Sequence, residues 1–269
     1  MQGLFFWGAV GCYSVAAVWI TFNHLRGVRP SVLSWWLILA GWLAQWLPLV
    51  RHLLAEHGAL AVNLSASLEL SALAMGGIYL LWWRLRREDA RTVGVLLLPL
   101  MVFTLVGAHL LPAHPDLRLM TDPLLLGHLV LSLLAYALFS IAAILALMDA
   151  FQEHALKTKH LGRLFTLLPP LDSLEETLFL MVSMGFVLLT TSMLTGGWYA
   201  YGERGAALAF THKQVFTWAT WLLFGVLLLG RRLQGWRGRR AVRFTLWGYL
   251  FLALAFFGVK FVTEIVLGR

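Results

Sequence analysis

The chain has 269 residues, of which 60% are hydrophobic and only 13% are charged, and it contains 13 Trp and 17 Phe. This composition excludes a soluble globular protein and is typical of an integral membrane protein. The formal net charge is +8, but most Lys and Arg residues lie in short connections between apolar segments. We therefore interpret the charge as a signal of membrane topology and expect no nucleic-acid partner.

Apolar segments recur along the whole sequence, and each is long enough to cross a hydrocarbon layer about 30 Å thick as a helix. The sequence predicts an all-α, polytopic membrane protein with about eight transmembrane helices, forming a single integral membrane domain over residues 1–269. The predicted spans are Leu4 to Phe22, Val32 to Val50, Leu64 to Trp83, Val93 to Leu111, Leu124 to Met148, Leu174 to Leu194, Val215 to Leu229 and Phe244 to Val266.

Two of these spans carry capping signals at their starts. Asp122 followed by Pro123 predicts the first turn of the fifth helix. Ser173 with Glu176 predicts a capping box for the sixth helix, after a Pro-Pro turn.

The distribution of basic residues predicts the orientation of the helices. The connections 1–2, 3–4, 5–6 and 7–8 hold 15 Lys and Arg residues, whereas the other connections and the C-terminus hold 5. Because basic residues concentrate in cytoplasmic connections, we expect both termini on the non-cytoplasmic side.

Cysteine usage narrows the possible chemistry. Cys12 is the only cysteine and lies inside the first predicted span. One cysteine excludes a disulfide framework, a CxxC redox pair, a cysteine-rich zinc site and covalent haem attachment. Any haem in this protein is therefore expected to be b-type, held without thioether bonds.

The polar residues within or beside the spans gather at the predicted outer side. They are Glu69, His109, His114, His128, His212, Lys260 and Glu264. His128 lies in the apolar stretch LLLGHLVLSLLAY and shares a helix face with Ser132 and Tyr136, at spacings of four residues. An ionisable side chain in a span is a functional candidate. Alternatively, His128 only bonds a carbonyl of a neighbouring helix as packing.

The predicted outer connection before the seventh span holds a second group of candidates. His212 precedes the span, and Lys213 and Arg204 supply cations that suit the propionates of a haem. Trp198 lies in the stretch GGWYAYGERGAALAF, which we expect to form an aromatic, glycine-rich shelf for a planar ligand. A solvated interfacial loop is the alternative reading of the same residues.

Three segments together resemble the cytochrome c assembly family of haem-handling membrane proteins, the CcsA and CcmC type, and are closest to its shorter YpjD or HemX branch. The segments, within roughly residues 120 to 265, begin LLLGHLVLSLLAYALF, LPPLDSLEETLFLMVSMGFVLLTTSMLTG and HKQVFTWATWLLFGVLLLGRRLQGWRG. In order, they are similar to the family's external histidine at the head of a span, its leucine-proline turn before a glycine-phenylalanine helix, and its Gly-Trp-Arg-Gly connection.

The resemblance implies a haem-binding, haem-handling protein of the bacterial inner membrane in c-type cytochrome biogenesis. It implies His128 as a haem ligand and, as partners besides the lipid bilayer, other cytochrome c assembly proteins or the apocytochrome. The family's tryptophan-rich outer signature is reduced here to Trp198, and its second histidine after the last span has no counterpart. Position alone therefore makes His212 the expected second ligand, with Trp198, Arg204, Lys213 and Tyr136 around the haem.

The sequence is also compatible with other functions. A transporter for a small molecule or metal would use the polar stripe as a path, although no clear repeat or mid-membrane charge pair is visible. A regulatory membrane subunit without haem is a further alternative, whereas a two-haem electron-transfer subunit lacks histidines at a second depth. No nucleophile, acid–base pair or nucleotide-binding loop is apparent, which favours haem handling over enzymatic turnover.

Overall fold

The structure of the chain is a computed structural model that describes residues 2–28, 32–55, 60–61, 64–85, 87–111, 119–120, 122–158, 169–204 and 211–258. These residues are almost entirely helical, which confirms the predicted all-α class. The helices are α1 (Gln2–Leu25), α2 (Val32–Ala55), α3 (Leu64–Leu85), α4 (Arg87–Leu110), α5 (Pro123–Thr158), α6 (Leu171–Arg204), α7 (His212–Gln234) and α8 (Arg239–Ala253), and α8 continues as the π-helical turn η2 (Leu254–Gly258).

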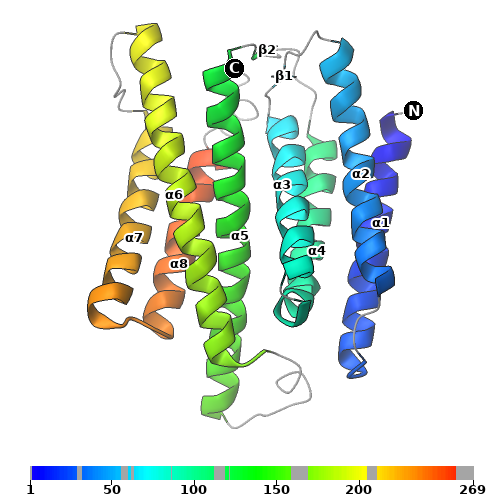
Figure 1. The fold of residues 1–269 in the computed structure, drawn as a ribbon, viewed down its shortest axis with the longest axis vertical. Coiled ribbons are helices and arrows are strands. Elements are labelled where there is room, and N and C mark those ends of the chain that lie inside the picture. Colours follow the sequence, from blue (N-terminus) through cyan, green and yellow to red (C-terminus); the bar gives the residue numbers. More distant parts are fainter. Residues whose placement is uncertain are drawn as a thin grey trace.

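The helices alternate in direction and form two groups that lie side by side (Figure 1). Helices α1 to α4 pack together in one group and α5 to α8 in the other, and α3 and α4 contact α5. Helices α1, α3, α5 and α7 begin at the upper end of Figure 1. At this end the short strand β1 (Leu60–Ala61) pairs antiparallel with β2 (Leu119–Met120) and joins two connections.

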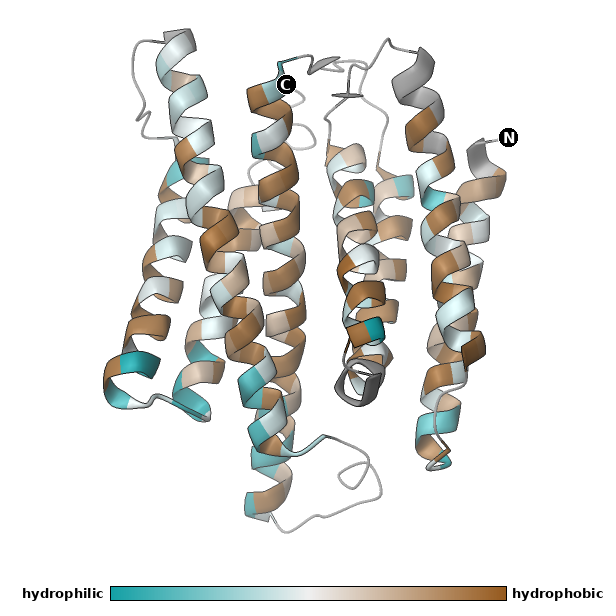
Figure 2. Ribbon diagram, viewed as in Figure 1, coloured by the Kyte–Doolittle hydropathy of each residue, from teal (hydrophilic) through white to brown (hydrophobic). Residues whose placement is uncertain are grey.

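Among the residues that the structure describes, seven helices are long and apolar enough to cross a membrane, and α2 contains a shorter apolar stretch, Val32–Leu47. Hydrophilic residues gather at the lower ends of α5 to α8, whereas hydrophobic residues dominate the middle of the helices (Figure 2). The described part of the chain therefore has the form of a multi-pass membrane protein, as the composition predicted.

Two expectations about helix boundaries have opposite outcomes. Asp122 does cap α5, because its Oδ1 accepts hydrogen bonds from the backbone N–H of Leu124 at 2.7 Å and of Leu125 at 3.2 Å. The predicted capping box of the sixth helix is wrong. Helix α6 already begins at Leu171, and the backbone N–H of Leu174 donates to the Pro170 carbonyl, so Ser173 lies inside the first turn.

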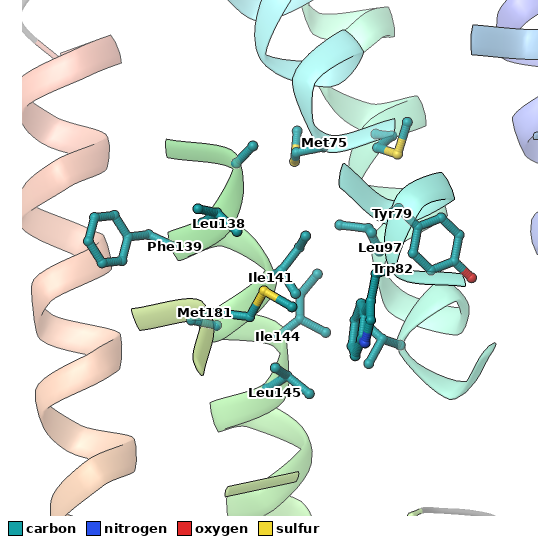
Figure 3. Close-up of a cluster of buried hydrophobic side chains, with 14 of the residues drawn as sticks. Met75, Tyr79, Trp82, Leu97, Leu138, Phe139, Ile141, Ile144, Leu145 and Met181 are labelled. Atoms are coloured by element: carbon teal, nitrogen blue, oxygen red, sulfur yellow. The ribbon is translucent and has the colours of Figure 1, made fainter. Parts of the chain in front are cut away.

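The two groups of helices share an apolar core. Side chains of α5, including Ile141, Ile144 and Leu145, lie between Met181 of α6 and Trp82 of α3 (Figure 3). All five side chains are buried. Because α5 contacts helices of both groups, it is the central helix that positions the polar residues described next.

A stacked aromatic pair fixes the centre of the second group. The rings of Phe139 on α5 and Phe224 on α7 stack with centroids 4.0 Å apart, and both are fully buried. Gly185 of α6 and Gly248 of α8 lie against this pair, where an added Cβ would meet ring carbons at 3.0 Å and 2.8 Å. The two glycines therefore let all four helices approach one aromatic stack.

Candidate functional site

His128 lies in the second turn of α5, near the upper end of the bundle, and its ring points toward α6. The imidazole Nδ1 lies 2.7 Å from the backbone carbonyl oxygen of Ser192 and 3.1 Å from the Ser192 hydroxyl. A carbonyl oxygen only accepts hydrogen bonds, so the proton of the neutral ring belongs on Nδ1. His128 is thereby held in the tautomer that leaves Nε2 with a free lone pair.

The two serines beside His128 continue this hydrogen-bond chain. The Ser132 hydroxyl donates to the His128 carbonyl at 2.7 Å, and it lies 2.7 Å from the Ser192 hydroxyl. With its own proton used, Ser132 accepts from Ser192, which leaves the Ser192 oxygen free to accept from Nδ1. This series of hydrogen bonds fixes which atom donates in each of them. No residue within the described ranges forms a hydrogen bond with Nε2 of His128.

Gly196 provides the space that the imidazole occupies. A Cβ built at Gly196 would lie 2.7 Å from Cε1 and 2.9 Å from Nδ1 of His128. Any side chain at this position would displace the ring. Gly196 is one helical turn beyond Ser192, so one face of α6 supplies both the acceptor and the space.

Tyr136, on the same stripe of α5, lies about 12 Å deeper than His128 at 1.5 Å per residue. Its hydroxyl is 2.9 Å from the hydroxyl of Tyr249 on α8, which also accepts from Ser140 at 3.2 Å. Phe256 stacks on the Tyr136 ring with a centroid distance of 5.5 Å. The stripe therefore contacts α6 at His128 and α8 at Tyr136, so its members belong to two different contacts.

The start of α7 is brought to the depth of His128 by the packing of α6 on α7. Trp221 of α7 donates to the Thr190 hydroxyl at 3.0 Å, and its ring stacks on Phe186 with a centroid distance of 5.5 Å. Extending this antiparallel register toward the upper end places Trp198 level with Lys213, which is close enough to His128 for a charge interaction.

His212 and Lys213 occupy the first turn of α7, and both are exposed. Thr211 caps this helix by accepting a hydrogen bond from the Gln214 N–H at 3.4 Å. The first N–H groups of a helix carry partial positive charge, which adds to that of Lys213. The structure thus gathers Trp198, His212 and Lys213 within about one helical turn of the depth of His128.

The prediction of a glycine-rich shelf is wrong for the part of this stretch that the structure describes. Gly196 to Arg204 forms the last turns of α6, because the sequence GGWYAYGER stays helical instead of opening into a loop. Trp198 is 77% exposed on this helix. Arg204 is the final residue of α6, its side chain is outside the described part, and residues 205–210 are not described.

Among the other polar candidates, His109 lies at the end of α4. The Phe6 ring stacks on the His109 ring with a centroid distance of 4.5 Å, and the Trp7 ring packs edge-on with a centroid distance of 5.4 Å. Glu69 of α3 is close enough to His109 for a charge interaction. These residues belong to the first group of helices. His114, Lys260 and Glu264 lie outside the described residues.

Ser192 and Gly196 are the residues of the site that the sequence interpretation missed. Their spacing of four residues, within TTSMLTGG, is an available signal for one helix face. Nothing in the sequence pairs that face with His128, because the pairing depends on the register between α5 and α6. That register is set far below the site, where Phe139 of α5 lies against Gly185 of α6.

The sequence is similar to several known proteins. A family model described as cytochrome C assembly protein matches residues 61–267. The inner membrane protein YpjD of Escherichia coli K12 is 36% identical over 181 residues, covering 66% of this chain and 68% of that protein. An uncharacterized 28.8 kDa protein of Azospirillum brasilense is 38% identical over 141 residues, or 52% of each chain.

More distant similarity extends to named biogenesis proteins. The cytochrome c biogenesis protein CcsA of Prochlorococcus marinus is 29% identical over 91 residues, which cover 34% of this chain and 29% of that protein.

The described residues form eight helices, seven of them candidate spans, and so define a multi-pass membrane protein. Its similarity to YpjD, which is named an inner membrane protein, indicates the inner membrane. The family match covers well over half of the sequence. The chain belongs to the cytochrome c assembly protein family, as the three segments predicted, and this membership supports a role in cytochrome c biogenesis.

Proposed function

We propose that this protein binds haem non-covalently at the outer face of the inner membrane, with His128 as an iron ligand, during c-type cytochrome assembly. The observation that carries the proposal is the orientation of the imidazole. Its Nδ1–H is committed to the Ser192 carbonyl at 2.7 Å, so Nε2 presents its lone pair. A ligating histidine normally has its other ring nitrogen fixed in this way.

The surroundings of His128 fit a haem group. Gly196 makes room for the imidazole, Trp198 offers an exposed aromatic ring, and Lys213 supplies a cation for a propionate. We assign His212, exposed at the start of α7, as the second ligand, and Arg204 as a further propionate partner. Haem would supply a redox-active iron, whose potential depends on its ligands and on its exposure to water.

Tyr136 takes a supporting position in this proposal. Its hydroxyl is engaged with Tyr249 at 2.9 Å, and it is buried about two turns below His128. We therefore propose that it fixes α5 against α8 beneath the haem, as part of the wall of the site. The acceptor of the haem would be an apocytochrome or another assembly protein at the same membrane face.

The experiment that tests the proposal measures haem retained by the detergent-purified protein after expression with ample haem supply. We expect haem in the wild type, its loss in His128→Ala and its retention in His154→Ala, a matched control exposed near the opposite end of α5. A His212→Ala variant that keeps haem but changes from six-coordinate to five-coordinate iron supports the second ligand. Equal haem in His128→Ala and the wild type would refute the assignment.

A further inference from the structure

The turn between α7 and α8 is a compact, arginine-rich structure at the lower end of the bundle. Gly235 and Gly238 adopt positive φ angles of 63° and 54°, which side-chain-bearing residues rarely adopt. The Trp236 ring packs directly against Gly230, and its Nε1–H donates to the Gln234 side chain at 2.7 Å. The turn therefore holds the arginines around it in defined positions.

Three of these arginines are paired with the ends of α5 and α6. Nη1 of Arg231 lies 3.9 Å from Oε2 of Glu175, and Nε of Arg237 lies 3.8 Å from the same oxygen. The other carboxylate oxygen of Glu175, Oε1, accepts a hydrogen bond from the Gly238 N–H at 2.7 Å. Arg239 lies 3.0 Å from the Glu153 carboxylate. These contacts fasten the turn to the neighbouring helices.

The remaining three arginines, Arg232, Arg240 and Arg243, are exposed and form no ion pair with any carboxylate in the described ranges. Arg243 Nε donates to the Arg239 carbonyl at 3.3 Å, which directs its side chain back toward the start of α8. The Arg240 guanidinium lies 5.7 Å from the centre of the Trp236 ring. Arg240 and Arg243 thus place two unneutralised charges at one end of one helix.

The exposed face of α8 continues upward from these charges as an apolar stripe. Trp247, Leu250 and Leu254 follow Arg240 and Arg243 at alternating spacings of three and four residues, and they are 56%, 46% and 38% exposed. The opposite face, with Ala241, Thr245, Gly248 and Leu252, is buried. We call the exposed residues Arg240, Arg243, Trp247, Leu250 and Leu254 the α8 stripe.

We propose that the α8 stripe is a binding site for an anionic phospholipid, with Arg240 and Arg243 on the phosphate and the acyl chain along Trp247, Leu250 and Leu254. The order of chemistry on the stripe matches the amphiphile, because two cations at the end of a span precede an aromatic ring and aliphatic side chains. A planar guanidinium group can donate hydrogen bonds to two oxygens of one phosphate, and tryptophan rings prefer the membrane interface. The charge complementarity selects anionic over zwitterionic lipid.

The test is native mass spectrometry of the full-length protein in detergent with added phosphatidylglycerol or phosphatidylcholine. We expect at least one tightly bound phosphatidylglycerol and much weaker retention of phosphatidylcholine. A double Arg240→Gln and Arg243→Gln variant should lose roughly twenty-five-fold in affinity for phosphatidylglycerol, at about five-fold for each arginine near an anionic headgroup. The matched control is Arg84→Gln, which changes an exposed arginine at the lower end of α3.

Two further measurements define the lipid as the occupant. Trp247→Ala should weaken the binding of long-chain phosphatidylglycerol and leave the binding of a short-chain analogue unaffected. Inorganic phosphate at millimolar concentration should not compete with the lipid. Equal binding of both lipid types to the wild type, or unchanged lipid binding in the double arginine variant, would overturn the proposal. Full competition by inorganic phosphate would overturn it in favour of a free-phosphate site. Helical circular dichroism and gel filtration confirm that each variant is folded.

Discussion

The orientation of His128 depends on two residues of the neighbouring helix, Ser192 and Gly196. The backbone carbonyl of Ser192 accepts a hydrogen bond from the Nδ1–H of His128, and no substitution of the Ser192 side chain removes this carbonyl. Gly196 leaves the space that the ring fills. Of this arrangement, the sequence predicted His128, because a histidine in an apolar run is conspicuous, but not its two partners, which depend on helix register.

The first prediction concerns Gly196. Gly196→Ala should displace the His128 ring, because the new methyl group would lie 2.7 Å from Cε1. We expect haem affinity to fall about ten-fold or more, equivalent to about 1.4 kcal/mol, as measured by haemin titration of the purified protein. Gly197→Ala is the control, since a Cβ at Gly197 meets no atom within 4 Å. Equal loss in both variants would contradict the role given to Gly196.

The second prediction separates the Ser192 side chain from its backbone. Ser192→Ala removes the hydroxyl that contacts Ser132 and Nδ1 but keeps the carbonyl that fixes the tautomer. Hydrogen bonds between membrane helices contribute about 0.6 kcal/mol on average, so haem should be retained with a small loss of stability. Complete loss of haem in this variant would show that the hydroxyl, and not the carbonyl, orients the ring.

At the scale of elements, hydropathy predicted the number of helices well and their ends less well. Helices α5 and α6 have 36 and 34 residues, more than a bilayer requires, because a helix continues past the apolar layer where local contacts stabilise it. Gln152, for example, donates to the Pro169 carbonyl at 2.8 Å and joins these extensions. The shelf expected around Trp198 failed for the same reason, since the polar end of α6 remains helical.

The third prediction tests the aromatic stack that fixes the second group of helices. Gly248→Ala places a methyl group 2.8 Å from the fully buried Phe224 ring, so α8 must move or the ring must tilt. Overpacking of this kind typically costs about 1 to 3 kcal/mol. Thermal unfolding in detergent should show this loss, whereas Gly11→Ala, with no neighbour within 4 Å, should not be destabilised.

The fourth prediction concerns the attachment of the α7–α8 turn. Glu175→Gln removes the charge that faces Arg231 and Arg237 and weakens the hydrogen bond from the Gly238 N–H. Because the Arg237 side chain is 62% exposed, we expect a loss of only about 1 kcal/mol in unfolding free energy. The adjacent exposed Glu176→Gln serves as the control, and equal effects of the two variants would contradict the attachment.

At the scale of the whole molecule, the proposed function depends on which end of the bundle faces outward. The distribution of Lys and Arg predicts the upper end, with the His128 site, as the outer one. Periodicity and charge are sufficient for this expectation because the bilayer constrains helices strongly. They do not specify which helices pack together, which is why the two groups and the central place of α5 emerge only from the structure.

The orientation can be tested by cysteine labelling, because Cys12 is the only native cysteine. In a Cys12→Ala background, Thr211→Cys at the start of α7 should react with a membrane-impermeant maleimide in intact spheroplasts. Arg232→Cys, at the opposite end of α7, should react only after lysis. Both positions are exposed, so the reverse pattern would contradict the outward orientation of the site.

Ligation of haem iron by His128 is tested most directly by a haemin titration of a His128→Gly variant, with and without free imidazole, followed in the Soret region. If His128 ligates the iron through Nε2, the variant should bind haemin weakly, and imidazole should restore the wild-type spectrum by occupying the vacated space. A variant that binds haemin with the wild-type spectrum in the absence of imidazole would show that His128 is not a ligand.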